Sequence, residues 1–301
     1  MNQLQKEIVE LKNKLGVTIL AHNYMEPEVQ DIADFCGDSL ELSRKAKENK
    51  ADTILFCGVR FMGETAKLLS PNARVVMPTG EAGCPMADTC QVEALKVWKA
   101  DHPEHVIVAY VNTTAATKAL VDICVTSGNA ERIVKKLGND RPIMFLPDRN
   151  LGANLNNRLG MKMDLWNGCC RVHNHISTSD ILKIKELHPN AKVMVHLECT
   201  PEVVALADAA LSTAGMLKYV EQTDSKEFIV GTECGMLHRL RMQFPDREFF
   251  GLQPSIVCPN MKKVSLELVR DALLGKGFEI VLPDDIMRDA VRPIERMLEM
   301  S

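Results

Sequence analysis

The sequence has no long hydrophobic run. No apolar stretch approaches the roughly 18 residues that a membrane-spanning helix needs. The first residues mix charged and apolar side chains at helical spacing, unlike the continuous apolar core of a secretory signal. Charge of neither sign is in large excess, with 36 Lys and Arg against 40 Asp and Glu, so nothing favours nucleic acid as a partner. We therefore expect a soluble cytoplasmic protein that uses neither membrane nor nucleic acid and acts on small metabolites.

Several motifs of common enzyme classes are also missing. No G-x-G-x-x-G follows the first expected strand and no G-x-x-x-x-G-K-[ST] occurs, so dinucleotide and nucleoside-triphosphate sites lack their phosphate loops. There is no H-E-x-x-H, no C-x2-C zinc pair and no closely spaced cysteine triplet of the ferredoxin kind. Ten cysteines are nevertheless present. In a cytosolic protein they are expected to be reduced thiols, used for packing, catalysis or metal binding.

The chain repeats itself three times. Three segments, beginning at Val17, His105 and Ala191, align without gaps, and each combines a β-branched run, a turn and an apolar helical pattern that ends at Ser or Thr. Each continues into a second strand, a helix and a third extended run, and a helix precedes each copy, around 3–14, 89–100 and 178–188. This alternation predicts small parallel sheets with right-handed crossovers.

The expected fold class is α/β, with three homologous α/β/α units in a pseudo-threefold arrangement around a central site. We place the units at 1–86, 87–173 and 174–263. A helix at 264–275, the strand "FEIVLP" and a last helix from about 285 follow. We expect this tail, 264–301, to pack back on the first unit.

Only three cysteines recur in every copy. Cys84 and Cys258 are 174 positions apart, and Cys170 lies between them at 86 and 88, a more regular spacing than that of its neighbour Cys169. Equivalent positions of a pseudo-threefold assembly converge, so these three thiolates would meet at one centre. They would suit an iron–sulfur cluster with one open iron or a zinc ion with one open position. The alternative is three unrelated core cysteines.

Polar side chains recur at the ends of the first strands. Residues two apart in a strand face the same side, and open parallel sheets bind ligands at the carboxyl ends of their strands. The aligned positions are His22 with Tyr24, Tyr110 with Asn112, and His196 with Glu198. Their agreement in all three copies favours a functional site over isolated core residues.

A third aligned set comprises Ser39, Ser127 and Thr213, each expected as the N-cap of the following helix. A helix N-terminus presents free N–H groups and a partial positive charge to an anion. Three such ends around one axis predict an acidic metabolite, such as one with two carboxylates and a phosphate.

The ordered motifs "AHNY", "YVN", "GCPMA", "PDRNLG", "H.EC", "GTE" and "C.NMKK" resemble the quinolinate synthase family from about residue 15 to the C-terminus. The resemblance implies a triangular three-domain fold with a [4Fe-4S] cluster held by Cys84, Cys170 and Cys258. The family's G-x-C-x-V-H motif fits "GCCRVH" only through Cys170. Cys258 begins Cys-Pro-Asn-Met rather than the C-x-x-C of some members, which leaves thiol–disulfide control there without its second cysteine.

The same resemblance implies the reaction. Iminoaspartate (iminosuccinate) and dihydroxyacetone phosphate condense to quinolinate, with loss of phosphate and water, on the route to NAD; an L-aspartate oxidase or dehydrogenase would supply the imine. The implied substrate-binding residues are His22, Ser39, Tyr110, Val111, Asn112, Ser127, His196, Leu197, Glu198, Ser212 and Thr213. The expected catalytic residues are Glu198, Tyr110, His22, Tyr24 and His173.

Within this scheme, Glu198 is expected to be the general base, because dehydration requires removal of a carbon-bound proton beside a carbonyl or imine. Tyr110 and His22 would relay protons or hold oxyanions. Rival interpretations are another cluster-dependent hydro-lyase, a non-catalytic iron–sulfur or oxygen sensor, a structural zinc protein, and a repeat protein with buried thiols.

Overall fold

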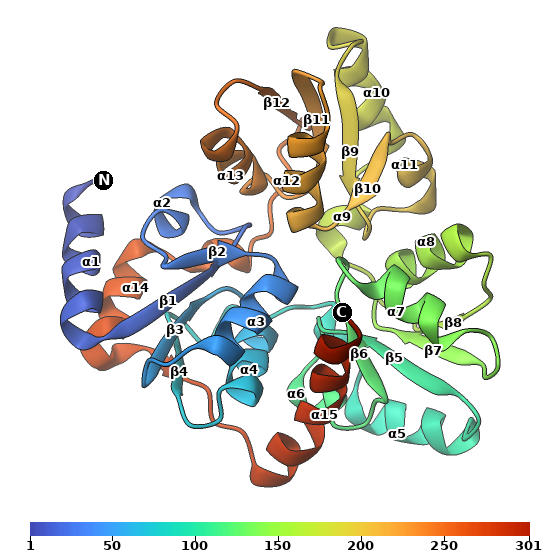
Figure 1. Cartoon of the computed structure of the whole chain (residues 1–301), viewed down its shortest axis with the longest axis horizontal. Helices are drawn as coiled ribbons and strands as arrows, with labels where there is room; N and C mark the ends of the chain where they lie inside the picture. The colour runs from blue at the N-terminus through green and yellow to red at the C-terminus, as the bar shows by residue number, and fades with distance from the viewer.

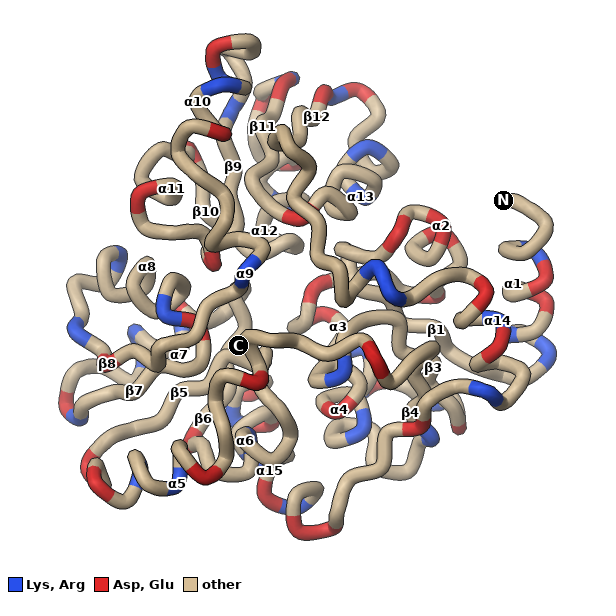
Figure 2. Tube along the Cα trace, turned by 180° about the vertical axis from the view of Figure 1, so that it is seen from behind, with Lys and Arg blue, Asp and Glu red and all other residues tan.

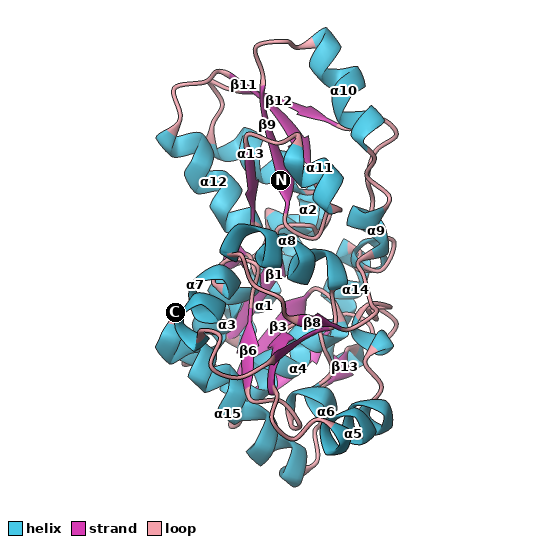
Figure 3. Cartoon of the chain, turned by 90° about the vertical axis from the view of Figure 1, so that its right-hand side faces the viewer, coloured by secondary structure: helices cyan, strands magenta, loops and turns pink.

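The computed structural model describes residues 1–301 and contains three small sheets arranged around a common centre (Figure 1). Four parallel strands in each sheet follow one order, in which the first and third strands of the unit lie between the second and the fourth. Helices lie on both sides of the strands (Figure 3). The expected α/β fold with threefold arrangement is confirmed.

Four helices and four strands alternate in the same order in each of the three units. The first unit contains α1 (Gln3–Leu15), β1 (Val17–His22), α2 (Pro27–Gln30), β2 (Phe35–Gly37), α3 (Ser39–Glu48), β3 (Thr53–Cys57), α4 (Arg60–Leu69) and β4 (Arg74–Met77). The second contains the 3-10 turn η1 (Ala87–Thr89), α5 (Val92–Asp101), β5 (Val106–Tyr110), α6 (Ala115–Lys118), β6 (Ile123–Val125), α7 (Ala130–Leu137), β7 (Ile143–Leu146), α8 (Arg149–Leu159), β8 (Asp164–Leu165) and α9 (Arg171–Asn174).

The third unit and the tail complete the chain. The third unit contains α10 (Thr178–Leu187), β9 (Lys192–His196), α11 (Pro201–Ala205), β10 (Ala209–Leu211), α12 (Thr213–Gln222), β11 (Glu227–Gly231), α13 (Met236–Gln243) and β12 (Glu248–Gly251). The third unit ends with η2 (Met261–Lys263), and the tail contains α14 (Leu266–Asp271), η3 (Ala272–Lys276), β13 (Phe278–Glu279) and α15 (Asp284–Met300).

The repeat extends to individual hydrogen bonds. In the first unit, Asp34 Oδ2 accepts the N–H of Ile19 in β1 at 2.8 Å. The equivalent Asp122 and Asp208 accept the N–H groups of the equivalent strand residues at 2.7 and 2.8 Å. Each carboxylate thereby satisfies a backbone donor of the first strand just before the second strand begins.

The helical pattern expected after each first strand was wrong in its length. Instead of one helix reaching the aligned Ser or Thr, α2, α6 and α11 have only four or five residues, and β2, β6 and β10 follow them. These short strands pair in parallel with β1, β5 and β9. Pairing satisfies the backbone groups on that edge of the first strand, which outweighs the local helical pattern.

The tail divides between two units. As expected, α14 contacts α1, and β13 pairs antiparallel with β4 of the first unit. The last helix, α15, lies mainly against β6 and α6 of the second unit and also contacts α4 of the first (Figure 1). Its buried face, with Ala290, Ile294 and Met297, joins the apolar core that contains Ile123 of β6. Burial of this face fixes the helix where the second sheet offers apolar surface.

Charged residues of both signs are interspersed along the chain in all three units (Figure 2). No helix combines the length and the apolar character that crossing a bilayer would require.

Candidate active site

The carboxyl ends of the first strands face one central cavity. His22, Tyr110 and His196 are the last residues of β1, β5 and β9, and all three line this cavity. The cavity encloses about 990 Å³, including its open mouth. The sequence places polar residues at these strand ends, and the parallel sheets bring them together.

Most of the predicted site residues line the cavity. They are His22, Tyr24, Ser39, Cys84, Tyr110, Asn112, Ser127, Cys170, His173, His196, Glu198, Thr213 and Cys258. Val111, Leu197 and Ser212 do not line it. Val111 and Leu197 each lie one position from a lining residue and are buried. Ser212 is buried as the N-cap of α12, where its hydroxyl accepts the N–H of Gly215 at 3.1 Å.

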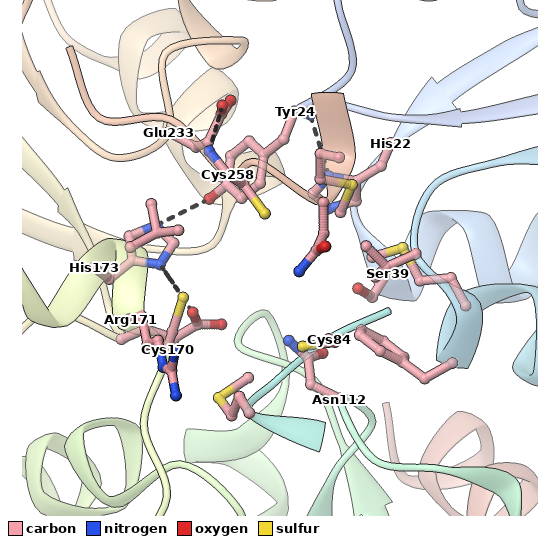
Figure 4. A pocket seen from close by; sticks show the side chains of 18 of the residues that line it. His22, Tyr24, Ser39, Cys84, Asn112, Cys170, Arg171, His173, Glu233 and Cys258 are labelled. Atoms are coloured by element: carbon pink, nitrogen blue, oxygen red, sulfur yellow. Dashed lines mark hydrogen bonds and ion pairs between the residues drawn. The ribbon is translucent and has the colours of Figure 1, made fainter. Parts of the chain in front are cut away.

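One cysteine from each unit reaches the cavity (Figure 4). Cys84 follows β4, Cys170 follows β8 as the N-cap of α9, and Cys258 follows β12. Cys169 is not among the lining residues. No disulfide involves any of the ten cysteines. The three loops that follow the fourth strands thus present three free sulfur atoms to one space.

All three thiols are in buried surroundings, which disfavour the ionised thiolate. Burial raises the pKa of Cys84 to about 12 and also raises the pKa values of Cys170 and Cys258. The thiolates therefore need a cationic partner, which a metal centre supplies. Three sulfur donors that share a cavity fit a soft metal or an iron–sulfur cluster.

Two buried carboxylates hold the cysteine loops. The Cys170 N–H donates to Asp148 Oδ2 at 3.1 Å, and the Cys258 N–H donates to Glu233 Oε1 at 3.1 Å. Asp148 lies two residues after the end of β7, and Glu233 lies two residues after the end of β11; β7 and β11 are the third strands of their units. Their motifs, "PDRNLG" and "GTE", were recognised in the sequence, but no role was assigned to either carboxylate. Both carboxylates follow equivalent strands at the same distance, and this agreement in the sequence could have indicated that they share a role.

The two strand-end histidines are neutral. Burial is the main cause that lowers the pKa of both His22 and His196 to about 3. In each, Nδ1 accepts a backbone N–H from two residues further on, that of Tyr24 at 3.1 Å and that of Glu198 at 3.2 Å. The proton of the neutral ring is therefore on Nε2, which makes both side chains hydrogen-bond donors through Nε2.

Glu198 is the centre of a buried polar network. Its Oε1 accepts a 2.6 Å hydrogen bond from the Tyr110 hydroxyl, and its Oε2 lies 2.9 Å from Nδ1 of His173. Burial alone would raise the pKa of Glu198, but His196, His173 and the donated hydrogen bonds outweigh it and lower the pKa. Burial, followed by the Glu198 charge, raises the pKa of Tyr110, so that the hydroxyl keeps its proton.

The network continues from His173 to Tyr24 through Thr232. His173 Nε2 lies 2.8 Å from the Thr232 hydroxyl, which lies 2.6 Å from the Tyr24 hydroxyl. Because the Glu198 carboxylate can only accept, His173 Nδ1 carries a proton and donates it to Glu198. Tyr24, Thr232, His173 and Glu198 thus form one continuous chain of hydrogen bonds. Thr232 was missed in the sequence because it has no polar equivalent in the other copies.

The helix ends near the axis differ from the expected caps. Asp38 and Ser212 cap α3 and α12, so Ser39 and Thr213 are the first helical residues rather than the N-caps. In the second unit Asn129 occupies the N-cap position, and Ser127 precedes it by two residues. The cap expectation was therefore wrong at all three positions, although all three side chains line the cavity.

One group of side chains is arranged as a metal site. Cys170, His173 and Glu198 place one ligand atom each within 4.8 Å of one another. Within this group, His173 Nδ1 lies 3.2 Å from Cys170 Sγ. Part of the acid–base network therefore adjoins a sulfur atom of the cysteine trio.

The chain matches proteins of one known family over nearly its whole length. The family model described as "Quinolinate synthetase A protein" matches residues 6–299. The chain is 48% identical to the quinolinate synthase of Methanoregula boonei over 297 residues, which is 99% of this chain and 98% of the relative. It is 47% identical to that of Desulforudis audaxviator over 299 residues, 99% of both chains. It belongs to the quinolinate synthase family.

A third quinolinate synthase, from Thermodesulfovibrio yellowstonii, is 46% identical over 301 residues, covering 100% of this chain and 99% of the relative. These matches include all three units and the tail. The family resemblance expected from the ordered motifs is confirmed, and the chain is an enzyme of the quinolinate synthase family.

Proposed function

We propose that this enzyme condenses iminoaspartate with dihydroxyacetone phosphate to form quinolinate, releasing phosphate and water, in the de novo synthesis of NAD. The observation that carries the proposal is the cavity that one cysteine from each unit lines together with the Glu198 network, which Cys170 adjoins. The names of the relatives support this reaction over other condensations. An L-aspartate oxidase or dehydrogenase would supply the unstable imine.

Cys84, Cys170 and Cys258 would hold a [4Fe-4S] cluster, for which three free cysteine sulfurs around one cavity are a fitting donor set. When bound, a cluster with three protein ligands supplies a Lewis-acidic iron that polarises a substrate oxygen. Asp148 and Glu233 orient two of the three cysteine loops through backbone N–H groups.

The rest of the cavity fits an anionic substrate pair. The first turns of α3 and α12 provide Ser39 and Thr213, and Ser127 precedes α7, so the helix ends offer hydroxyls and partial positive charge to carboxylate or phosphate groups. His22 and His196 add neutral Nε2 donors. Asn112 adds an amide whose buried Oδ1 has no partner within the protein.

Glu198 would remove the carbon-bound protons. Glu198 is ionised and lines the cavity, so its carboxylate is available there to accept a proton. Tyr110 would donate to oxyanions as its bond to Glu198 is released. Protons accepted at Glu198 would redistribute along His173, Thr232 and Tyr24, because these groups already form one chain of hydrogen bonds.

Water exclusion would protect the imine. His22, His173, His196 and Glu198 are each at most 5% exposed. Imines hydrolyse readily, so a buried reaction space favours condensation over loss of the substrate.

The test is anaerobic purification with iron and sulfide analysis, followed by a quinolinate assay with both substrates. We expect iron, sulfide and quinolinate from the wild type, loss of iron from Cys170→Ser, and retention of iron in the matched Cys169→Ser. Zinc without iron would indicate a zinc protein. Iron and sulfide without quinolinate would indicate another hydro-lyase or a sensor. Loss of iron from Cys169→Ser alone would overturn the ligand set.

A further inference from the structure

A buried side-chain nitrogen holds the loop that follows the first strand of the second unit. Lys118 Nζ donates hydrogen bonds to the carbonyl oxygens of Val111, at 2.7 Å, and of Thr113. These residues flank Asn112, which lines the cavity. Lys118 is fully buried, and the Phe61 ring lies 5.5 Å from its Nζ. A fully buried ammonium is costly, so its two carbonyl partners are a specific arrangement.

The first unit has the same arrangement with another residue. Gln30 is the repeat equivalent of Lys118 and is 6% exposed. Its Nε2 donates to the carbonyls of Asn23 at 3.1 Å and Met25 at 2.8 Å. These two residues flank Tyr24, the repeat equivalent of Asn112.

In the third unit the equivalent position is Val204, which has no donor. The role passes to Asn154 of α8 in the second unit, which is 2% exposed. Its Nδ2 donates to the carbonyls of Leu197 and Cys199, both at 2.9 Å. These residues flank Glu198, the third member of the aligned set.

We infer that Gln30, Lys118 and Asn154 are positioning residues that set the backbone on both sides of Tyr24, Asn112 and Glu198. The substrate and catalytic roles of Tyr24, Asn112 and Glu198 rest on the proposed function. The hydrogen bonds to the flanking carbonyl oxygens are independent of it. Three different residue types, one of them contributed by another unit, make the same pair of bonds. Packing alone does not require this agreement.

The bonds also connect the units. Gln30 Nε2 lies 3.0 Å from the carbonyl oxygen of Gly235 in the third unit. Asn150, one turn before Asn154, donates to the Glu198 carbonyl at 3.1 Å. The loop carrying Glu198 is therefore held only when the third unit is docked on the second, whereas Gln30 and Lys118 each hold a loop of their own unit.

The test compares Lys118→Met and Lys118→Gln in the holoenzyme. Methionine keeps the apolar stem but leaves two buried carbonyls without a donor. We expect Lys118→Met to raise KM for the substrate that contacts Asn112 by about tenfold, with iron content unchanged. In an Asn112→Ala background the same change should alter KM by less than about twofold, because no amide remains to be positioned. Lys118→Gln, which introduces the residue found at position 30, should restore most of the loss.

Asn154→Leu gives a contrasting result. Since Asn154 acts on the proposed base, we expect kcat to fall about tenfold with a smaller change in KM. Two results would overturn the positioning role. One is that Lys118→Met raises KM by the same factor in the Asn112→Ala background as in the wild type. The other is that the single variants lower the melting temperature but leave KM and kcat per folded enzyme unchanged.

Hydrogen exchange separates this inference from the proposed function. If Asn112→Ala leaves the kinetics unchanged, the substrate role of Asn112 fails. The backbone role is then decided by amide exchange at 110–114, which should be faster in Lys118→Met than in Lys118→Gln or the wild type. Unchanged exchange would refute it.

Discussion

The Tyr110 hydroxyl donates a 2.6 Å hydrogen bond to Glu198 and joins the second unit to the third across the cavity. Neither residue has its partner within its own unit. This hydrogen bond therefore forms only when the second and third units are assembled.

Replacing Glu198 with Gln removes the negative charge but keeps an oxygen for Tyr110. We expect turnover to fall at least about 100-fold, because an amide cannot act as a base. The absorption spectrum and iron content should match the wild type. Glu248→Gln, at an exposed strand residue, is the control. Normal turnover in the Glu198 variant would remove Glu198 from its proposed role.

Stability should decrease as the pH falls below 6.5. The pKa values of His22 and His196 are lowered from 6.5 to about 3 in the folded protein, mainly by burial. Between these pH values the unfolded chain binds protons that the folded chain does not, so each histidine lowers the free energy of unfolding by about 1.4 kcal/mol per pH unit.

Denaturant titrations at several pH values measure this dependence. The variant His22→Gln/His196→Gln should have a shallower slope in this window, whereas the exposed His175→Gln should retain the wild-type slope. A wild-type slope in the double variant would show that other groups cause the acid sensitivity.

Gly168 leaves no room for a side chain beside the second cysteine loop. A Cβ there would lie 2.3 Å from Thr89 Oγ1 and 2.5 Å from the carbonyl oxygen of Pro147. We expect Gly168→Ala to displace Cys170 and reduce bound iron. Gly83, which precedes Cys84, has no atom within 4 Å of an added Cβ, so Gly83→Ala should keep its iron. Equal iron contents in the two variants would contradict this account.

The last helix should stabilise the second unit. Ile294 is fully buried in α15, and Ile294→Ala should cost about 2–4 kcal/mol of unfolding free energy. Amide exchange should increase first in β6 and α6. Val281→Ala, at a residue that is 78% exposed, should have little effect. Faster exchange confined to the first sheet would show that α15 acts elsewhere.

The repeat made much of the fold and of the cavity predictable. Cys84, Cys170 and Cys258 are almost evenly spaced along the sequence, as equivalent positions of repeated units must be. Their meeting at one cavity follows from the arrangement of those units. The strand ends at His22 and His196 follow the same rule. These features could be predicted because each copy retains a related residue.

The remaining features depend on contacts that differ between copies. Asn154 acts in place of an absent donor at Val204, so comparing aligned positions does not find it. The position of α15 depends on which sheet has an uncovered apolar surface, which no local pattern records. The short strand β2 is set by the free edge of β1 rather than by its own residues.

Fusing three like units into one polypeptide has a consequence for chemistry. A homotrimer would place the same side chain at all three corners of its axis, because symmetry repeats every substitution. Here one corner can carry a carboxylate, another an amide and the third a phenol, while the sulfur positions stay alike. The covalent connection thus allows an asymmetric reaction to be served by an almost symmetric scaffold.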